Sequence, residues 1–286
     1  MAEEPAQQPS GEPAEQPAAA TFVALTPETQ AIWEQNAGFW DERMGEGNEF
    51  QRLLVGPAAE RLLALRPGER VVEAACGNGV FSRRMAALGA QVVASDFSPT
   101  FVARAQARTA DQPYADRVTY TVADATDETQ LLALGAPGSF DAAYCGMAFM
   151  DMTTIEPLLQ SLHRLLKPSG RFVFSLAHPC FNSGTFRLGI EEEDRAGDLV
   201  TTYYVRIAGY TQPQAARGLG MLGQPAPHYY FHRSLSDLFG ACFRHGFALD
   251  GLEEPTFPTD SSSPRPLSWA NYTDIPPVLV ARLRLA

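Results

Sequence analysis

From Arg70 onward, the chain alternates between short apolar runs and segments whose apolar residues recur at helical spacing. The apolar runs, which predict strands, are Val71–Ala75, Gln91–Ser95, Val118–Val122, Phe140–Cys145, Arg171–Leu176, Phe247–Leu252 and Val278–Leu285. The segments that predict helices are Val80–Leu88, Pro99–Arg108, Asp127–Leu134, Thr154–Leu166 and Ser234–His245. Because strands that are apolar along most of their length are buried on both faces, the pattern predicts an α/β fold with a mostly parallel sheet and helices on both faces.

Two segments depart from this alternation. Residues 1–20 are dominated by Ala, Pro, Gln and Glu and contain no aromatic residue, which predicts a disordered tail over residues 1–22. We expect residues 23–286 to form a single domain, in which residues 23–66 make an N-terminal helical cap. Residues 181–230, which follow the fifth predicted strand, show no clear period and predict a lid-like insertion over a substrate.

Charge and composition limit the partners. The formal charge is −11, from 22 basic and 33 acidic residues. Since phosphate backbones and anionic membrane surfaces attract cations, we expect neither nucleic acid nor membrane as a partner, but a small-molecule substrate. The sequence carries no long apolar run and no secretory signal, so we expect a cytoplasmic protein, either a monomer or a homodimer. The cysteines are widely spaced and predict no metal site.

The segment Val71–Phe81 carries most of the functional information, because a predicted strand there enters a glycine-rich turn and then a helix. Gly77 and Gly79 can adopt positive φ and let a ligand approach the backbone. Glu73 stands just before them, and its carboxylate would repel a diphosphate but attract an ammonium group. Where a dinucleotide-binding turn has a third glycine, this chain has Ser82.

Acidic residues also end the next two predicted strands, at Asp96 and Asp124. Asp96 follows Glu73 at a spacing suited to the hydroxyls of a ribose, and Asp124 can accept a hydrogen bond from an adenine amino group. The carboxyl ends of parallel strands face one crevice, so we expect all three carboxylates to lie around one ligand. S-adenosylmethionine, with its amino group and sulfonium, suits these charges better than NAD does.

These motifs resemble those of the class I S-adenosylmethionine-dependent methyltransferases. Glu73–Gly79 looks like their first motif, Val92–Pro99 and Val122–Ala125 are similar to the second and third, and Leu165–Phe174 resembles the stretch that enters their fifth strand. The resemblance implies a Rossmann-like, seven-stranded, mostly parallel sheet whose last strand is antiparallel. It also implies S-adenosylmethionine as cofactor and in-line methyl transfer to O, N or C of a small organic molecule.

The resemblance further implies where the cofactor is held. The methionine part would lie against Glu73 and the glycine turn, the ribose at Asp96, and the adenine at Asp124 beside Phe97. The full implied set is Glu73, Ala75, Cys76, Gly77, Asn78, Gly79, Asp96, Phe97, Ser98, Asp124, Ala125, Cys145, Gly146 and Met147. Many family members have a glycine where this chain has Ala75-Cys76, and we expect small residues to be tolerated there.

The acceptor site is less well marked. Its best catalytic candidate is His178, directly after the fifth predicted strand, with His232 second, because a neutral imidazole takes up a proton near pH 7. A histidine that only fixes a loop is the competing interpretation. Aromatic candidates for substrate contact are Trp40, Tyr203, Tyr229 and Tyr230.

Two alternatives stay open at this point. One is an NAD(P)-dependent oxidoreductase on a related sheet, which Glu73 and Ser82 disfavour. The other is a family member that binds the cofactor but transfers no methyl group.

Overall fold

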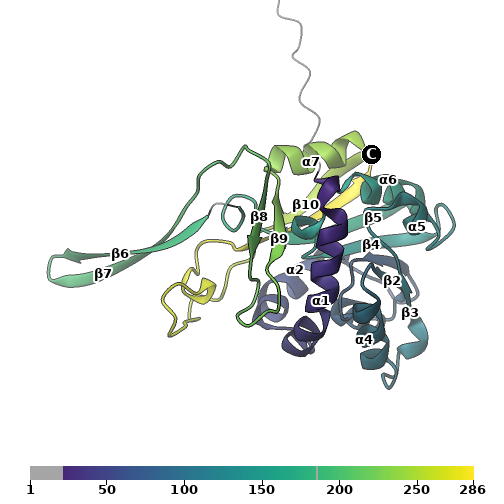
Figure 1. Cartoon of the computed structure of the whole chain (residues 1–286), viewed down its shortest axis with the longest axis horizontal. Helices are drawn as coiled ribbons and strands as arrows, with labels where there is room; N and C mark the ends of the chain where they lie inside the picture. The colour runs from purple at the N-terminus through teal and green to yellow at the C-terminus, as the bar shows by residue number, and fades with distance from the viewer. Residues whose placement is uncertain (1–21, 185) are drawn as a thin grey trace, which may run out of the picture.

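A computed structural model of the protein describes residues 22–184 and 186–286. In these residues, a sheet lies between layers of helices (Figure 1). The tail expected at residues 1–22 therefore falls almost wholly outside the described residues. The sheet has seven strands in the order β10-β11-β5-β4-β1-β2-β3. Their bounds are β1 Arg70–Ala74, β2 Gln91–Asp96, β3 Val118–Val122, β4 Phe140–Gly146, β5 Leu166–Ala177, β10 Phe247–Glu253 and β11 Val278–Leu285.

The strand directions are those that the family resemblance implies. Strands β1 to β5 pair in parallel wherever they are neighbours. Strand β11 runs antiparallel to both of its neighbours, β5 and β10. The predicted seven-stranded, mostly parallel sheet with an antiparallel last strand is therefore confirmed.

Helices cover both faces of the sheet. The buried residues of α5 (Glu128–Leu132), α6 (Glu156–Leu165) and α7 (Leu235–Arg244) belong to one core. Those of α2 (Gly56–Leu63) and α3 (Val80–Ala87) belong to a second core. The remaining long helices are α1 (Thr26–Met44), which packs on α4, and α4 (Pro99–Thr109), which packs on β2 and β3.

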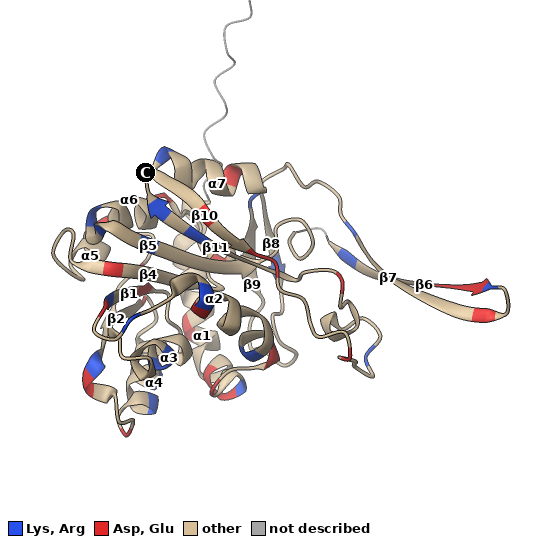
Figure 2. Ribbon diagram, turned by 180° about the vertical axis from the view of Figure 1, so that it is seen from behind, with Lys and Arg blue, Asp and Glu red and all other residues tan. Residues whose placement is uncertain are grey.

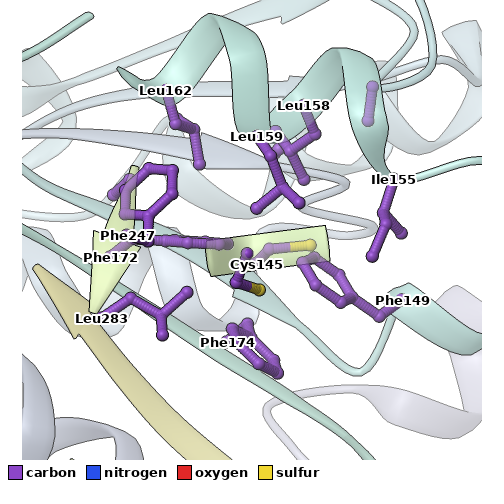
Figure 3. Close-up of a cluster of buried hydrophobic side chains, with 14 of the residues drawn as sticks. Cys145, Phe149, Ile155, Leu158, Leu159, Leu162, Phe172, Phe174, Phe247 and Leu283 are labelled. Atoms are coloured by element: carbon purple, nitrogen blue, oxygen red, sulfur yellow. The ribbon is translucent and has the colours of Figure 1, made fainter. Parts of the chain in front are cut away.

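Strand β5 supplies both cores, because successive side chains of a strand point to opposite faces. Phe172 and Phe174 enter the core under α6, whereas Val173 enters the core on the other side. Figure 3 shows these two phenylalanines grouped with Cys145 and the α6 leucines. Burying each such ring contributes roughly 2 to 3 kcal/mol, so the apolar runs that predicted the strands also hold the sheet between its helices.

The segment after β5, which shows no sequence period, forms two hairpins. One consists of β6 (Arg187–Arg195) and β7 (Asp198–Arg206), the other of β8 (Gln214–Gly218) and β9 (His228–His232). The first hairpin projects from the body and carries acidic residues toward its far end (Figure 2). Much of it is exposed on both faces, so no buried face imposed an apolar alternation that the sequence could reveal.

The second hairpin lies beside α1, and β9 contacts that helix (Figure 1). Between α1 and α2 the chain forms a π-helical turn, η2 (Phe50–Val55). None of the helices in the described part combines the length and apolar character that crossing a membrane requires.

Candidate active site

The turn between β1 and α3 has the backbone that its glycines predicted. Gly77 and Gly79 have φ of 55° and 75°, and Ala75 also has a positive φ of 55°. A Cβ at Gly79 would lie 2.5 Å from the Tyr120 hydroxyl, so packing requires glycine there. A Cβ at Gly77 would meet nothing within 4 Å, which leaves open space for a ligand beside the backbone.

Glu73 lies at the carboxyl end of β1 with only 2% of its surface exposed. The Ser82 hydroxyl, in the first turn of α3, donates a hydrogen bond to the Glu73 carboxylate. Burial raises the pKa of Glu73 to about 8, although the Ser82 bond and the charge of Arg83 act in the opposite direction. A cation that binds beside Glu73 would therefore favour its ionised form.

Asp96, at the end of β2, is fixed by backbone donors. The amide of Gly77 donates to its Oδ2 at 2.9 Å, and the amide of Ser98 donates to its Oδ1 at 3.0 Å. Burial raises the pKa of Asp96 to about 6, and these two bonds limit the rise. A carboxylate oxygen accepts more than one hydrogen bond, so both remain available to the hydroxyls of a ligand.

Ser98 itself has a local role. Its hydroxyl donates to Glu34 and accepts a hydrogen bond from the amide of Phe101 at 3.1 Å, which caps α4. Ser98 is fully buried, and its expected cofactor contact stays a prediction.

A cavity of about 160 Å³ opens at the carboxyl ends of β1, β2 and β4. Of the residues implied by the family resemblance, it is lined by Glu73, Ala75, Cys76, Gly77, Asn78, Asp96, Phe97, Gly146 and Met147. Trp40 lines it from α1. Its carboxyl groups are Glu73, Asp96 and Asp151, and no Lys, Arg or His lines it in the described part of the chain. Such a wall offers no positive charge to a diphosphate, whereas its acids can ionise beside a cationic ligand.

A second, smaller cavity of about 40 Å³ shares Ala75, Phe97 and Asp151 with the first. Asp124 and Ala125 line this second cavity. The Asp124 carboxylate accepts hydrogen bonds from the side-chain amide of Gln30 at 2.5 Å and from the amide and hydroxyl of Thr126, both at 2.8 Å. The residues expected at the ribose and at the adenine thus line two adjoining cavities.

Cys145 is separated from the other residues that follow β4. Gly146 and Met147 line the larger cavity, but Cys145 is fully buried in the core beneath α6 (Figure 3). Cys145 still belongs to β4, whereas the strand ends at Gly146 and Met147 no longer follows its alternation. Met147 has a φ of 53° and its amide donates to the Ser175 carbonyl oxygen at 2.8 Å.

Neither histidine expected in catalysis lines the cavities described above. His178 is 1% exposed, accepts a hydrogen bond at Nδ1 from the amide of Cys180 at 3.1 Å, and donates from Nε2 to Glu254 at 2.8 Å. His232 contacts the Ser183 hydroxyl at 2.7 Å and, through Nε2, the Tyr210 carbonyl oxygen at 2.6 Å. Both rings therefore connect loop segments, and their catalytic role stays a prediction.

The expected aromatic residues are also spread out. Tyr203 packs on Tyr272 with ring centroids 5.1 Å apart, and Tyr229 donates to Glu28 at 2.9 Å. Tyr230 packs against the ring of His228 at 4.4 Å. Of the four aromatic candidates, Trp40 alone is among the residues that line the larger cavity in the described part of the chain.

Sequence reasoning missed Asp151, which lines both cavities from the short helix η4 (Phe149–Asp151). Its Oδ1 is buried and has no hydrogen-bond partner among the described residues, and the same holds for Nε1 of Trp33. The signal that identified Asp96 and Asp124, an acidic residue after a strand, was present here as well. Asp151 was overlooked because it follows the end of β4 by several residues instead of standing at it.

The described residues hold no group of three or more His, Cys, Asp or Glu side chains placed to bind a metal ion.

Comparison with known proteins agrees with this geometry. Residues 72–174 match a family model described as a methyltransferase domain. A solved S-adenosylmethionine-dependent methyltransferase from Mesorhizobium loti is 30% identical to this chain, with a TM-score of 0.60, over 80% of this chain and 96% of that one. This chain belongs to the S-adenosylmethionine-dependent methyltransferases. Membership in that family leaves the oxidoreductase alternative without support.

Curated methyltransferases match over a shorter region. A ubiquinone biosynthesis O-methyltransferase from Xanthomonas campestris is 36% identical over 109 residues, which cover 38% of this chain and 43% of that protein. A demethylmenaquinone methyltransferase from Clavibacter sepedonicus is 38% identical over 116 residues, which cover 41% and 44%. The chain thus matches less than half the length of these relatives.

Proposed function

We propose that this chain transfers the methyl group of S-adenosylmethionine to a small organic molecule. The observation that carries the proposal is the cavity at the ends of β1, β2 and β4, which has carboxyl groups at Glu73, Asp96 and Asp151 and no cationic side chain in the described part of the chain. S-adenosylmethionine, when bound, supplies a methyl group on a sulfonium that is already activated for displacement.

The residues fit this cofactor in three respects. Glu73 offers a buried acceptor for the ammonium of the methionine part, and Gly77 leaves open space beside the backbone. Asp96 offers oxygens for the ribose hydroxyls, and Asp124 lies in the adjoining cavity for the adenine. The remaining contribution of the protein is alignment of the acceptor and exclusion of water.

Relatives support a small acceptor. The names of the Xanthomonas and Clavibacter proteins refer to ubiquinone biosynthesis and demethylmenaquinone, which are small molecules. The acidic composition of this chain also disfavours a nucleic-acid acceptor. A role of residues 181–230 as a lid, a monomeric or dimeric state and a cytoplasmic location stay predictions.

The proposal is tested first by binding and then by turnover. Isothermal titration with S-adenosylhomocysteine should give a one-to-one complex with micromolar affinity. A coupled assay for released S-adenosylhomocysteine, run over a panel of phenols, amines and activated carbon acids, should then find at least one acceptor. No binding at millimolar ligand would reject the function, and binding without transfer to any acceptor would favour the non-methylating alternative.

A further inference from the structure

One carboxyl group in the wall of the cavity lacks a polar partner. Asp151 lines the larger cavity and the adjoining smaller one, and its Oδ1 has no hydrogen bond among the described residues. Burial raises the pKa of Asp151 well above its ordinary value, and no neighbouring cation offsets this effect. A buried acceptor atom without a partner destabilises the fold, so we expect it to serve a ligand.

His228, the histidine beside Asp151, is neutral. Nε2 of His228 lies 3.7 Å from Oδ1 of Asp151, which is longer than a hydrogen bond. Burial lowers the pKa of His228 to about 4, so its ring carries no charge near pH 7. His228 therefore supplies no counter-charge to Asp151.

The tautomer of His228 follows from the orientation of Gln224. The amide oxygen of Gln224 accepts hydrogen bonds from Nε1 of Trp40 at 3.0 Å and from the amide of Gly220 at 3.2 Å. Its amide nitrogen is thus the end that faces Nδ1 of His228, at 2.9 Å. Nδ1 accepts this bond, so the ring proton sits on Nε2, on the side of Asp151.

The backbone that carries Asp151 is held by a cation that does not pair with it. Arg233 donates to the carbonyl oxygens of Phe149 at 3.0 Å and Met152 at 2.7 Å, on either side of Asp151. The charge of Arg233 interacts with Glu156 and Asp237. Arg233 therefore fixes η4 in place while the Asp151 carboxyl remains without a counter-charge.

Aromatic rings complete this wall of the cavity. Trp33 and Trp40 both line it, with ring centroids 5.3 Å apart, and the ring of His228 lies 4.5 Å from that of Trp33. Indole faces attract cations, most strongly where water is excluded. A carboxyl group without a counter-charge next to two indoles is the combination that recognises an ammonium group.

We propose that Asp151 binds the protonated amine of the methyl acceptor, with Trp33 and Trp40 enclosing it, so that the acceptor class is a small amine. This inference rests on the proposed function of the same cavity. When the amine binds, the Asp151 carboxyl first gives its own proton to water, because the adjacent ammonium stabilises the carboxylate. The ammonium nitrogen then gives a proton to that carboxylate: the N–H bond breaks, an O–H bond forms, and the electron pair stays on nitrogen as the nucleophile. The neutral carboxyl that results is the form that its buried surroundings favour.

The test compares two probes of similar shape on the protein saturated with S-adenosylhomocysteine. Isothermal titration at pH 7.5 would measure the affinity of 2-phenylethylamine and of 2-phenylethanol for the wild-type complex, the Asp151→Asn variant and a control, Asp111→Asn, at an exposed position. We expect the amine to bind the wild type and the control at least tenfold more tightly than the alcohol. In Asp151→Asn the preference for the amine should disappear, and both probes are titrated onto that variant only after its own affinity for S-adenosylhomocysteine has been measured and the complex saturated.

The two probes compared on the wild type alone still test the inference if Asp151→Asn folds poorly. Equal affinity for the two probes, binding of neither, or a preference that persists in Asp151→Asn would overturn the amine assignment. Failure of S-adenosylhomocysteine to bind the wild type would instead reject the proposed function. The probe titrations are then repeated without S-adenosylhomocysteine, so that the preference for the amine is still tested.

Discussion

The Ser82 hydroxyl donates a hydrogen bond to the carboxylate of Glu73, from the first turn of α3 to the end of β1. At the position of Ser82 a dinucleotide-binding turn has a third glycine, which allows close packing of helix and strand. Here the side chain at that position orients the acid instead. In the sequence, the missing third glycine disfavoured NAD. In the structure, the serine that replaces it holds the Glu73 carboxylate in place.

Replacing this acid by its neutral isostere should weaken cofactor binding. We expect Glu73→Gln to lower the affinity for S-adenosylhomocysteine roughly ten- to hundredfold, because a hydrogen bond to a charged group contributes about 1.5 to 3 kcal/mol. Isothermal titration measures the loss. Glu42→Gln, at an exposed position of α1, is the matched control and should bind like the wild type. Equal affinities for both variants would mean that Glu73 does not contact the ammonium.

The stability of the cofactor-free protein should fall as the pH rises. The pKa of Glu73 is about 8 in the folded chain against an ordinary value of 4.5, and that of Asp96 is about 6 against 3.8. At a pH between the ordinary and the raised pKa of each acid, the unfolded chain has lost a proton that the folded chain retains. The free energy of unfolding therefore decreases as the pH rises through these two ranges.

Urea unfolding of the wild type and Glu73→Gln at several pH values isolates the share of Glu73. The difference between the two proteins should grow from about pH 5 to pH 8 in favour of the variant. A constant difference over that interval would show that Glu73 is ionised already at low pH.

The open space beside Gly77 predicts a variant that folds but binds the cofactor less tightly. In Gly77→Ala the methyl group projects into the cavity, so affinity for S-adenosylhomocysteine should fall at least tenfold. Gly138→Ala is the control, because Gly138 also has a positive φ, of 64°, and nothing within 4 Å of an added Cβ, but it lies in the loop before β4. Both variants should lose about 1 kcal/mol of stability from the left-handed backbone. Thermal unfolding and titration separate the two effects, and equal cofactor affinity in both variants would contradict the placement.

His178 should prove to be a structural residue. Because both its ring nitrogens have partners in Cys180 and Glu254, we expect His178→Ala to destabilise the fold by about 1 to 3 kcal/mol. Affinity for S-adenosylhomocysteine should change less than threefold. Chemical denaturation gives the first quantity and titration the second. Unchanged stability with a large loss of turnover would restore the catalytic role expected from the sequence.

Much of the fold could be predicted because burial on two faces leaves a strong pattern in the sequence. The apolar runs placed β11 at its observed bounds, and the other strands of the main sheet were also located. The β6–β7 hairpin could not be predicted, since neither of its faces is buried over most of its length. The sequence could not show that Gly146 lines the cavity whereas Cys145 does not. Both residues belong to one strand end, and only the packing of α6 shows that Cys145 is buried in the core.

By itself the sequence determined the parallel α/β sheet, the glycine turn and the acids at the ends of β1, β2 and β3, because each depends on residues adjacent in the chain. The tertiary structure alone decided which side chains surround Asp151. Asp151, Trp33 and His228 come from η4, α1 and β9, and no local pattern relates them. Their proximity, and the missing counter-charge beside Asp151, arise from packing between distant segments, which spacing along the chain does not encode.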